Sequence, residues 1–259
     1  MKARTFLWYL QRPSFYPYMV EEIARKFRRP DRRTIEERNI ATERCKKESM
    51  TLDDYLKGQR VDKFQIPDEY TDYAYKKEDE HKTGLGAGKP FEGLLGSLIL
   101  SRGFRYVLET GVATGWSSLE VLAALKAKNL KHHLISTDMP YPTKNFEPFV
   151  GCVVPESLRG NWSLIKKPDR NGLFDAFNLH DGDFDLMHYD SDKSYWGRMW
   201  AYSLMIRRLS RSGVFVSDDI GDNLAFFEFC ENNNFDYVVI DKDEDGRHFS
   251  GVIDFKNKL

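Results

Sequence analysis

The stretch Val107-Leu-Glu-Thr-Gly-Val-Ala-Thr-Gly-Trp-Ser-Ser118 decides the fold of this chain. An apolar run ends at Glu109, two glycines follow at Gly111 and Gly115, and a helix-forming sequence begins near Ser117. Glycines between a strand and a helix permit a tight turn and let a ligand approach the backbone closely. The stretch therefore predicts a βα unit with a ligand-binding turn at the carboxyl end of its strand.

The alternation of strands and helices continues on both sides of this unit. Short apolar runs predict strands over residues 105–108, 133–137, 162–166, 184–189, 213–217, 235–240 and 251–255. Amphipathic or apolar segments predict helices over residues 90–100, 117–128, 197–209 and 223–232. The last two strands follow each other without a helix. We therefore expect a Rossmann-like α/β fold: a mostly parallel seven-stranded sheet with one antiparallel edge strand and helices on both faces.

The composition changes near residue 90. Residues 1–89 are rich in charge and tyrosine, with amphipathic helices expected over residues 20–27 and 33–47. We assign residues 1–89 to an N-terminal helical extension or cap, and residues 90–259 to the ligand-binding domain. The basic run 25–33 contains an acid and a proline, and we interpret it as a solvated face.

The overall composition excludes several classes of protein. Hydrophobic residues make up 41% of the 259 residues, enough for a large core, and the net charge of -1 argues against a nucleic-acid partner. We expect no membrane span, because no run approaches about 18 apolar residues, and no signal peptide, because the apolar stretch 6–10 is too short. Three distant cysteines argue against a disulfide scaffold or zinc finger and favour a cytoplasmic protein.

The spacing of the glycines indicates which ligand the turn binds. A dinucleotide site prefers G-x-G-x-x-G, whereas here the second glycine lies four residues after the first. Glu109 would repel a phosphate and suits a ligand with a cationic end. Asp138 ends the next predicted strand, where a carboxylate can accept hydrogen bonds from ribose hydroxyls. A plain βα turn with a surface acid is the structural alternative.

These residues resemble motif I and the ribose-binding acid of the class I S-adenosylmethionine (SAM) methyltransferases. Over about residues 90–255 the chain is similar to the macrocin-type, metal-dependent O-methyltransferases. The matching motifs are Val154-Pro155 with Leu158 and Trp162, Asp190-Ser-Asp-Lys-Ser-Tyr195, Gly213-Val-Phe-Val-Ser-Asp-Asp219 and Asn223-x-Ala-Phe-Phe-Glu-Phe229. The resemblance implies SAM as cofactor, with contacts from Glu109, Gly111, Gly115, Ser117, Asp138 and Asp190.

Four carboxylates follow two of the predicted strands. Asp190 and Asp192 come after one strand, and Asp218 and Asp219 after the next. In a parallel sheet these strand ends are neighbours, so the four acids should converge and repel one another. A hard divalent cation such as Mg²⁺ or Ca²⁺ would resolve that conflict. The structural alternative for Asp218 and Asp219 is a helix cap with a first-turn acid.

The resemblance implies roles for these acids. Asp190, Asp218 and Asp219 would bind Mg²⁺ or another divalent cation, and Asp192 would be the general base. Related enzymes commonly carry His where this chain has Lys193. Lys193 is therefore a second catalytic candidate that pairs with Asp192, neutralises an acceptor carboxylate or reaches solvent. Asp169 follows the 162–166 strand, where related enzymes place a residue that contacts adenine.

We therefore expect a SAM- and Mg²⁺-dependent O-methyltransferase that acts on a hydroxyl of a glycan, glycoside or related small molecule. The sequence leaves open the acceptor, the methylated position and whether the protein is a homo-oligomer. Two alternatives remain. One is a non-catalytic SAM-binding or scaffold subunit, which Lys193 favours. The other is an NAD-dependent oxidoreductase, against which the missing third glycine argues.

Overall fold

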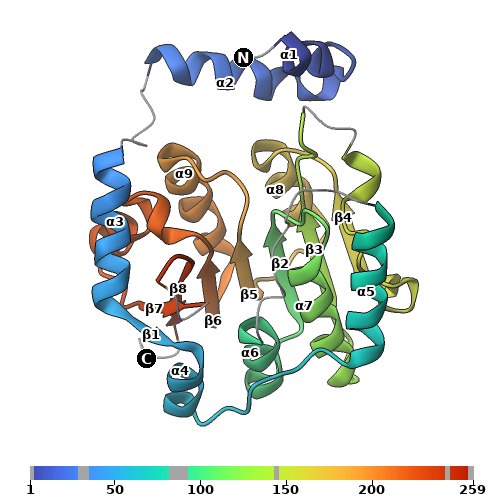
Figure 1. The fold of residues 1–259 in the computed structure, drawn as a ribbon, viewed down its shortest axis with the longest axis vertical. Coiled ribbons are helices and arrows are strands. Elements are labelled where there is room, and N and C mark those ends of the chain that lie inside the picture. Colours follow the sequence, from blue (N-terminus) through green and yellow to red (C-terminus); the bar gives the residue numbers. More distant parts are fainter. Residues whose placement is uncertain (1–2, 29–34, 82–92, 143–145, 243–245, 256–259) are drawn as a thin grey trace.

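A computed structural model describes residues 3–28, 35–81, 93–142, 146–242 and 246–255. Their centre is an eight-stranded sheet with the strand order β1-β7-β8-β6-β5-β2-β3-β4 (Figure 1). The strands are β1 (Ser49–Thr51), β2 (Tyr106–Thr110), β3 (His133–Thr137), β4 (Trp162–Ile165), β5 (Phe184–Tyr189), β6 (Leu209–Ser217), β7 (Val238–Asp241) and β8 (Phe249–Asp254). Only β8 runs antiparallel to its neighbours, β6 and β7.

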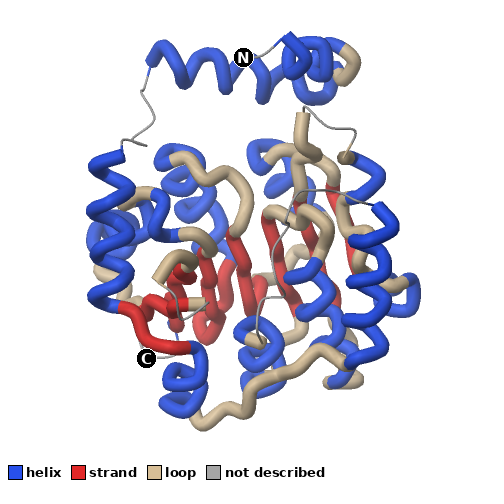
Figure 2. The backbone as a smooth tube through the Cα atoms, in the orientation of Figure 1, coloured by secondary structure: helices blue, strands red, loops and turns tan. Residues whose placement is uncertain are grey.

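Helices cover both faces of this sheet (Figure 2). They are α1 (Ala3–Leu10), α2 (Tyr16–Arg28), α3 (Ile35–Glu48), α4 (Leu52–Gln59), α5 (Asp68–His81), α6 (Leu94–Arg102), α7 (Trp116–Ala127), α8 (Asp169–Asn178), α9 (Tyr195–Met205) and α10 (Ala225–Asn233). Successive strand residues point to opposite faces. Val107 and Leu186 pack in one core with α4, α6 and α7, and their neighbours Leu108 and Met187 pack in the other with α3, α8, α9 and α10.

The register of the parallel strands places their carboxyl ends at one edge of the sheet. Thr110 at the end of β2 pairs with Thr137 of β3 and with Tyr189 of β5, and Tyr189 pairs with Ser217 of β6. The segments that follow these four strands therefore begin side by side. This register positions every residue of the predicted site.

The predicted Rossmann-like fold class is confirmed, and the sheet differs from the expectation in two details. It has eight strands, because β1 from the N-terminal region pairs in parallel with β7. The antiparallel strand β8 lies between β6 and β7, so it is not the edge strand. A three-residue strand carries no alternation that a sequence could reveal. The division at residue 90 remains a prediction, and no helix in the described ranges is long and apolar enough to span a membrane.

The first two helices lie across the carboxyl ends of the central strands (Figure 1). Trp8, Tyr9 and Phe15 form a small aromatic core, against which Met139, just after β3, packs. Two ion pairs fasten these helices to the rest of the chain: Arg12 with Glu147 at 3.3 Å, and Glu21 with Arg170 at 2.7 Å. The N-terminal helices therefore cover the edge of the sheet where the predicted site lies.

A buried acid joins the two helices that flank the motif strand. Glu120 of α7 is fully buried, and its Oε1 accepts a 2.6 Å hydrogen bond from the backbone N–H of Gly96 in the first turn of α6. Such a helix end favours negative charge. Burial outweighs the backbone hydrogen bonds and raises the pKa of Glu120 to about 8. The acid is therefore largely protonated in the folded protein at neutral pH.

This pKa predicts how stability depends on pH. Because the folded-state pKa lies above the unfolded value, stability is fully present below the unfolded pKa and is lost as the pH rises toward 8. Glu120→Gln keeps the oxygen that accepts from Gly96 and cannot ionise. We expect it to raise the free energy of unfolding at pH 8 by about 4 kcal/mol and to change it little at about pH 4. Urea unfolding at both pH values measures this, and an equal effect at the two would contradict it.

Candidate functional site

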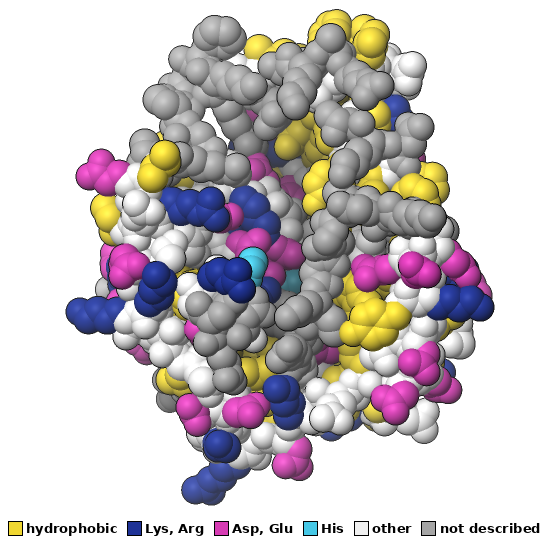
Figure 3. Space-filling model, viewed as in Figure 1, with side chains coloured by type: hydrophobic (Ala, Val, Ile, Leu, Met, Phe, Trp, Pro, Cys, Tyr) yellow, Lys and Arg dark blue, Asp and Glu magenta, His cyan; other side chains and the backbone are white. Residues whose placement is uncertain are grey.

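A cavity of about 680 Å³ opens at the carboxyl ends of the central strands. Its walls come from the turn after β2, from the segments that follow β3, β5 and β6, and from Thr5, Tyr9 and Tyr18 of the N-terminal helices. Figure 3 shows acidic, basic and histidine side chains gathered below those helices. The volume is typical of pockets that bind small molecules and cofactors.

The turn after β2 requires glycine at both motif positions. Gly111 and Gly115 have φ angles of +81° and +105°. A Cβ on Gly111 would lie 2.2 Å from the carbonyl oxygen of Asp190, and a Cβ on Gly115 would lie 2.9 Å from the Cα of Gly151. Any side chain would therefore push the turn away from the segments that surround it. Gly111 to Thr114 line the cavity, whereas Gly115 is not among the lining residues.

Glu109 lies beneath the turn, and it is not among the residues that line the cavity. It is fully buried and accepts hydrogen bonds from the hydroxyls of Ser117 (2.5 Å), Ser118 (2.5 Å) and Ser136 (2.7 Å). Burial alone would raise the pKa of Glu109, but nearby His188 and the serine hydroxyls lower it. Glu109 thus joins β2, the start of α7 and β3 below the ligand-binding turn.

Asp138 comes directly after β3 and lines the cavity. Its Oδ1 accepts hydrogen bonds from the backbone N–H groups of Val112 (2.9 Å) and Ala113 (3.2 Å) in the glycine turn. The residue is only 8% exposed, and burial raises its pKa to about 6 against the effect of these hydrogen bonds. The structure therefore brings Asp138 and the glycine turn together, as the sequence predicts.

Asp169 also lines the cavity, as the first residue of α8. It accepts hydrogen bonds from Ser191 Oγ (2.6 Å) and from the hydroxyl of Tyr189 (3.4 Å). Burial is the main reason why its pKa is raised to about 6. Asp169 thus ties α8 to the segment after β5. The sequence pattern did not predict α8, whose buried face of Leu173, Ala176 and Phe177 is interrupted in the sequence by the exposed Phe174.

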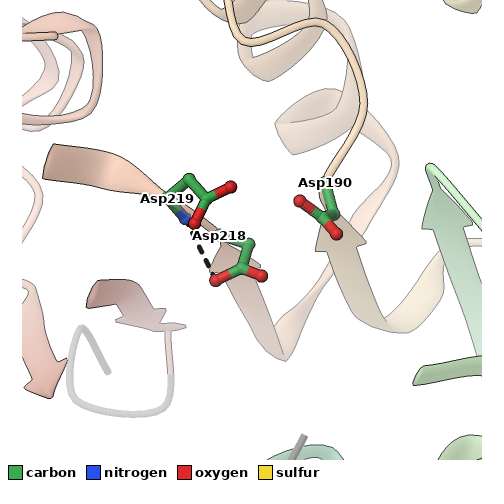
Figure 4. A group of neighbouring side chains, drawn as sticks. All are labelled: Asp190, Asp218 and Asp219. Carbon is green, nitrogen blue, oxygen red and sulfur yellow. Dashed lines mark hydrogen bonds between the residues drawn. The ribbon is translucent and has the colours of Figure 1, made fainter. Parts of the chain in front are cut away.

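Three of the four predicted acids form one cluster (Figure 4). Asp190 follows β5, Asp218 and Asp219 follow β6, and one oxygen from each lies within 4.8 Å of the others. Asp192 lies outside this cluster. Its Oδ1 accepts a 2.9 Å hydrogen bond from the backbone N–H of Ser194, the residue that caps α9. Of the four acids expected to converge, three do so, and Asp192 does not.

Two lysines contact the acid cluster. Lys193 Nζ pairs with Asp190 and lies 3.1 Å from Asp219 Oδ2, and Lys242 Nζ lies 2.7 Å from both oxygens of Asp218. Burial would raise the pKa of Asp218, but Lys242 and Lys193 hold it well below its usual range. Burial likewise opposes the charge on Lys193, yet Asp190 and Asp219 raise its pKa. Asp218 and Lys193 are therefore charged at neutral pH, whereas burial raises the pKa of Asp190 despite its pairing with Lys193.

Asp219 has a left-handed backbone, with φ of +50°. Non-glycine residues in this region cluster at functional sites, where surrounding contacts maintain the strain. Here the fully buried Arg198 of α9 donates from Nη2 to the carbonyl oxygen of Asp219 (2.8 Å). Sequence reasoning missed both Arg198 and Lys242, because neither belongs to a local motif and only the fold brings them to the cluster.

Residues 108–220 match the model of a family described as a methyltransferase domain. No curated protein matches the chain in sequence. Among solved structures, the chain resembles the O-methyltransferase from Bacillus cereus in complex with S-adenosylhomocysteine (SAH). That pair has 13% identity and a TM-score of 0.57, over 81% of this chain and 99% of the other.

Two further structures show the same fold. TomG from Streptomyces achromogenes, an O-methyltransferase involved in tomaymycin synthesis and in complex with SAM, is 17% identical with a TM-score of 0.56, over 78% of this chain and 95% of TomG. The SAH-bound methyltransferase PaMTH1 of Podospora anserina is 15% identical with a TM-score of 0.55, over 85% and 96% of the two chains. The solved structures confirm the predicted fold, and the family match supports the prediction of a methyltransferase domain over residues 108–220.

The raised pKa values predict how SAH binding depends on pH. A protonated Asp138 is a poorer acceptor for ribose hydroxyls, so we expect SAH to bind about fourfold more weakly at pH 5.5 than at pH 7.5, as one group with a pKa of about 6 requires. Calorimetric titration measures this. Asp138→Asn should bind weakly at both pH values. Asp169, whose pKa is also about 6, supplies the matched control: if Asp169→Asn abolishes the pH dependence and Asp138→Asn leaves it, the assignment is wrong.

Proposed function

We propose that this protein is a SAM-dependent O-methyltransferase that acts, with a divalent cation, on a hydroxyl of a glycan, glycoside or related small molecule. One observation carries the proposal: the glycine turn with Asp138 and the acid cluster line the same cavity. A methyltransferase must hold its methyl donor and its acceptor hydroxyl side by side. A cavity with both features at one sheet edge supports this arrangement.

The cofactor would lie along the turn after β2. Asp138 would accept hydrogen bonds from the ribose, and the turn from Gly111 to Thr114 would contact the rest of the molecule, with Gly115 keeping the turn close to Gly151. Ser117 lines the cavity, while its hydroxyl is already donated to Glu109. Glu109 therefore serves as a positioning residue for the turn. When bound, SAM supplies an electrophilic methyl group on a positively charged sulfur.

The acid cluster fits a divalent cation in chemistry and in spacing. Three carboxylates with oxygens within 4.8 Å of one another offer the hard ligands that Mg²⁺ prefers. Asp190, Asp218 and Asp219 would hold the ion, which would lower the pKa of a bound acceptor hydroxyl. Lys193 already pairs with two of these acids, so it would have to move away for the ion to bind.

The remaining residues act on the acceptor. Asp192 lines the cavity beside the cluster and is our candidate for the group that accepts the hydroxyl proton. In the metal-free arrangement Asp190 and Asp219 raise the pKa of Lys193, which is therefore an ammonium there. After displacement by the ion, Lys193 would lie near the acceptor as our second catalytic candidate. Thr5, Tyr9 and Tyr18 close the same cavity from above and would exclude water.

The two lysines also favour a second function. Because Lys193 and Lys242 already offset charge on the acid cluster, a SAM-binding subunit without metal-assisted chemistry would be stable with the same residues. Such a protein would bind SAH and transfer no methyl group. The experiments below separate the two.

Methyl transfer from SAM to a panel of glycosides and phenols, with Mg²⁺ and with a chelator, tests the main proposal. We expect chelator-sensitive transfer to a hydroxyl. Asp192→Asn should lower turnover by about 10²–10⁴-fold, the usual contribution of a general base, and leave SAH affinity nearly unchanged. Asp222→Asn is the matched control, since Asp222 lies near the cluster but does not line the cavity. SAH binding without transfer to any acceptor would support the non-catalytic alternative, and full turnover of Asp192→Asn would assign the proton to another group.

The pairing of Lys193 predicts its effect on metal affinity. The Lys193 ammonium occupies the acid cluster and repels a metal ion there. We therefore expect Lys193→Met, which removes this charge, to bind Mn²⁺ at least about tenfold more tightly than the unaltered protein. Electron paramagnetic resonance of free Mn²⁺ during titration measures this without an acceptor. Lys131→Met, which removes an exposed lysine, should have no effect. Equal affinity in all three proteins would mean that Lys193 does not compete with the ion.

A further inference from the structure

The two N-terminal helices are amphipathic, and their inner faces contact the rest of the protein. On α1, Trp8 and Tyr9 pack in the aromatic core, and Thr5 and Tyr9 line the cavity. On α2, Tyr18 lines the cavity and Glu21 pairs with Arg170 of α8. These contacts fix which side of each helix faces the protein. The opposite sides are therefore directed away from it.

The outer faces of both helices are apolar. On α1 they carry Phe6, Leu7 and Leu10, which are 42%, 56% and 46% exposed. On α2 the positions at helical spacing are Tyr16, Val20 and Ile23, of which Val20 is 60% exposed. Figure 3 shows apolar side chains at the top of the molecule, over α1. Soluble monomers rarely leave apolar residues grouped in this way, so such a surface indicates a partner.

The charge of this segment indicates the kind of partner. Residues 3–28 contain five basic and two acidic residues, although the whole chain has a net charge of -1. Aromatic and aliphatic residues on one face of a basic amphipathic helix are typical of helices that lie in the surface of a membrane. A second copy of the chain would bring like charges together across a two-fold axis. An anionic surface instead complements the segment in both charge and hydrophobicity.

We propose that the outer face of α1 and α2, formed by Phe6, Leu7, Leu10, Tyr16, Val20 and Ile23, docks on an anionic lipid membrane surface. The apolar side chains enter the boundary between headgroups and acyl chains, and the excess positive charge of residues 3–28 attracts the segment to an anionic surface. The protein lies on the membrane and does not span it. Because the inner faces of the same helices line the cavity, the docking face is directly behind the candidate site.

Flotation of the protein with lipid vesicles tests this proposal. We expect binding to vesicles of phosphatidylcholine with phosphatidylserine, and at least about tenfold weaker binding to phosphatidylcholine alone or in high salt. The double variant Leu7→Glu, Val20→Glu should bind the anionic vesicles at least about tenfold more weakly than the unaltered protein. Neither residue lines the cavity, so SAH affinity should not change and serves as a control for folding.

Ile40→Glu is the matched control variant. Ile40 is an aliphatic residue on α3 with 52% exposure, similar to that of Leu7, but lies outside the docking face. The Ile40→Glu variant should bind the anionic vesicles as tightly as the unaltered protein. The proposal is overturned if the unaltered protein does not bind these vesicles, or if the two glutamate variants bind alike. It is also overturned if analytical ultracentrifugation shows a dimer that only the double variant dissociates, since the face would then be covered by a second copy.

Discussion

The parallel pairing of β2 with β5 is the constraint on which the rest of the site depends. Asp190 N donates to the carbonyl oxygen of Thr110 (2.8 Å), and the carbonyl of Asp190 lies where a Cβ of Gly111 would be. The cofactor turn and the first acid of the cluster are therefore in direct contact. Glycine is required at position 111 because two functional segments share that space. The proposed methyl-donor and acceptor sites are adjacent for the same reason.

Charge balance decides what the acid cluster can do. Three carboxylates at one sheet edge would repel one another, and the chain offsets this with Lys193 and Lys242. The two lysines contact different acids of the cluster. Lys242 contacts both oxygens of Asp218, whereas Lys193 joins Asp190 to Asp219. A divalent cation at the proposed site would exchange with Lys193, so we expect this lysine to set the metal affinity.

Much of the fold and site could be predicted from the sequence, because the informative signals are local. The glycine turn and Asp138 follow neighbouring strands, and the parallel register of β2 and β3 places the Asp138 carboxylate against the backbone N–H groups of the turn. Long-range features escaped prediction. Lys242 and Arg198 act on acids that lie 24 and 21 positions away along the chain. The burial of Glu109 beneath three serines also follows from packing, and so does the separation of Asp192 from the cluster.

A crystal structure with SAH and Mn²⁺, with anomalous scattering from the metal, tests the central claim most directly. The account predicts SAH in the cavity with its ribose hydroxyls on Asp138. It also predicts one Mn²⁺ peak among Asp190, Asp218 and Asp219, with Lys193 displaced from Asp190 and Asp219. SAH bound elsewhere, or Mn²⁺ absent from the cluster at saturating concentration, would contradict the claim that one sheet edge holds the methyl donor and activates the acceptor.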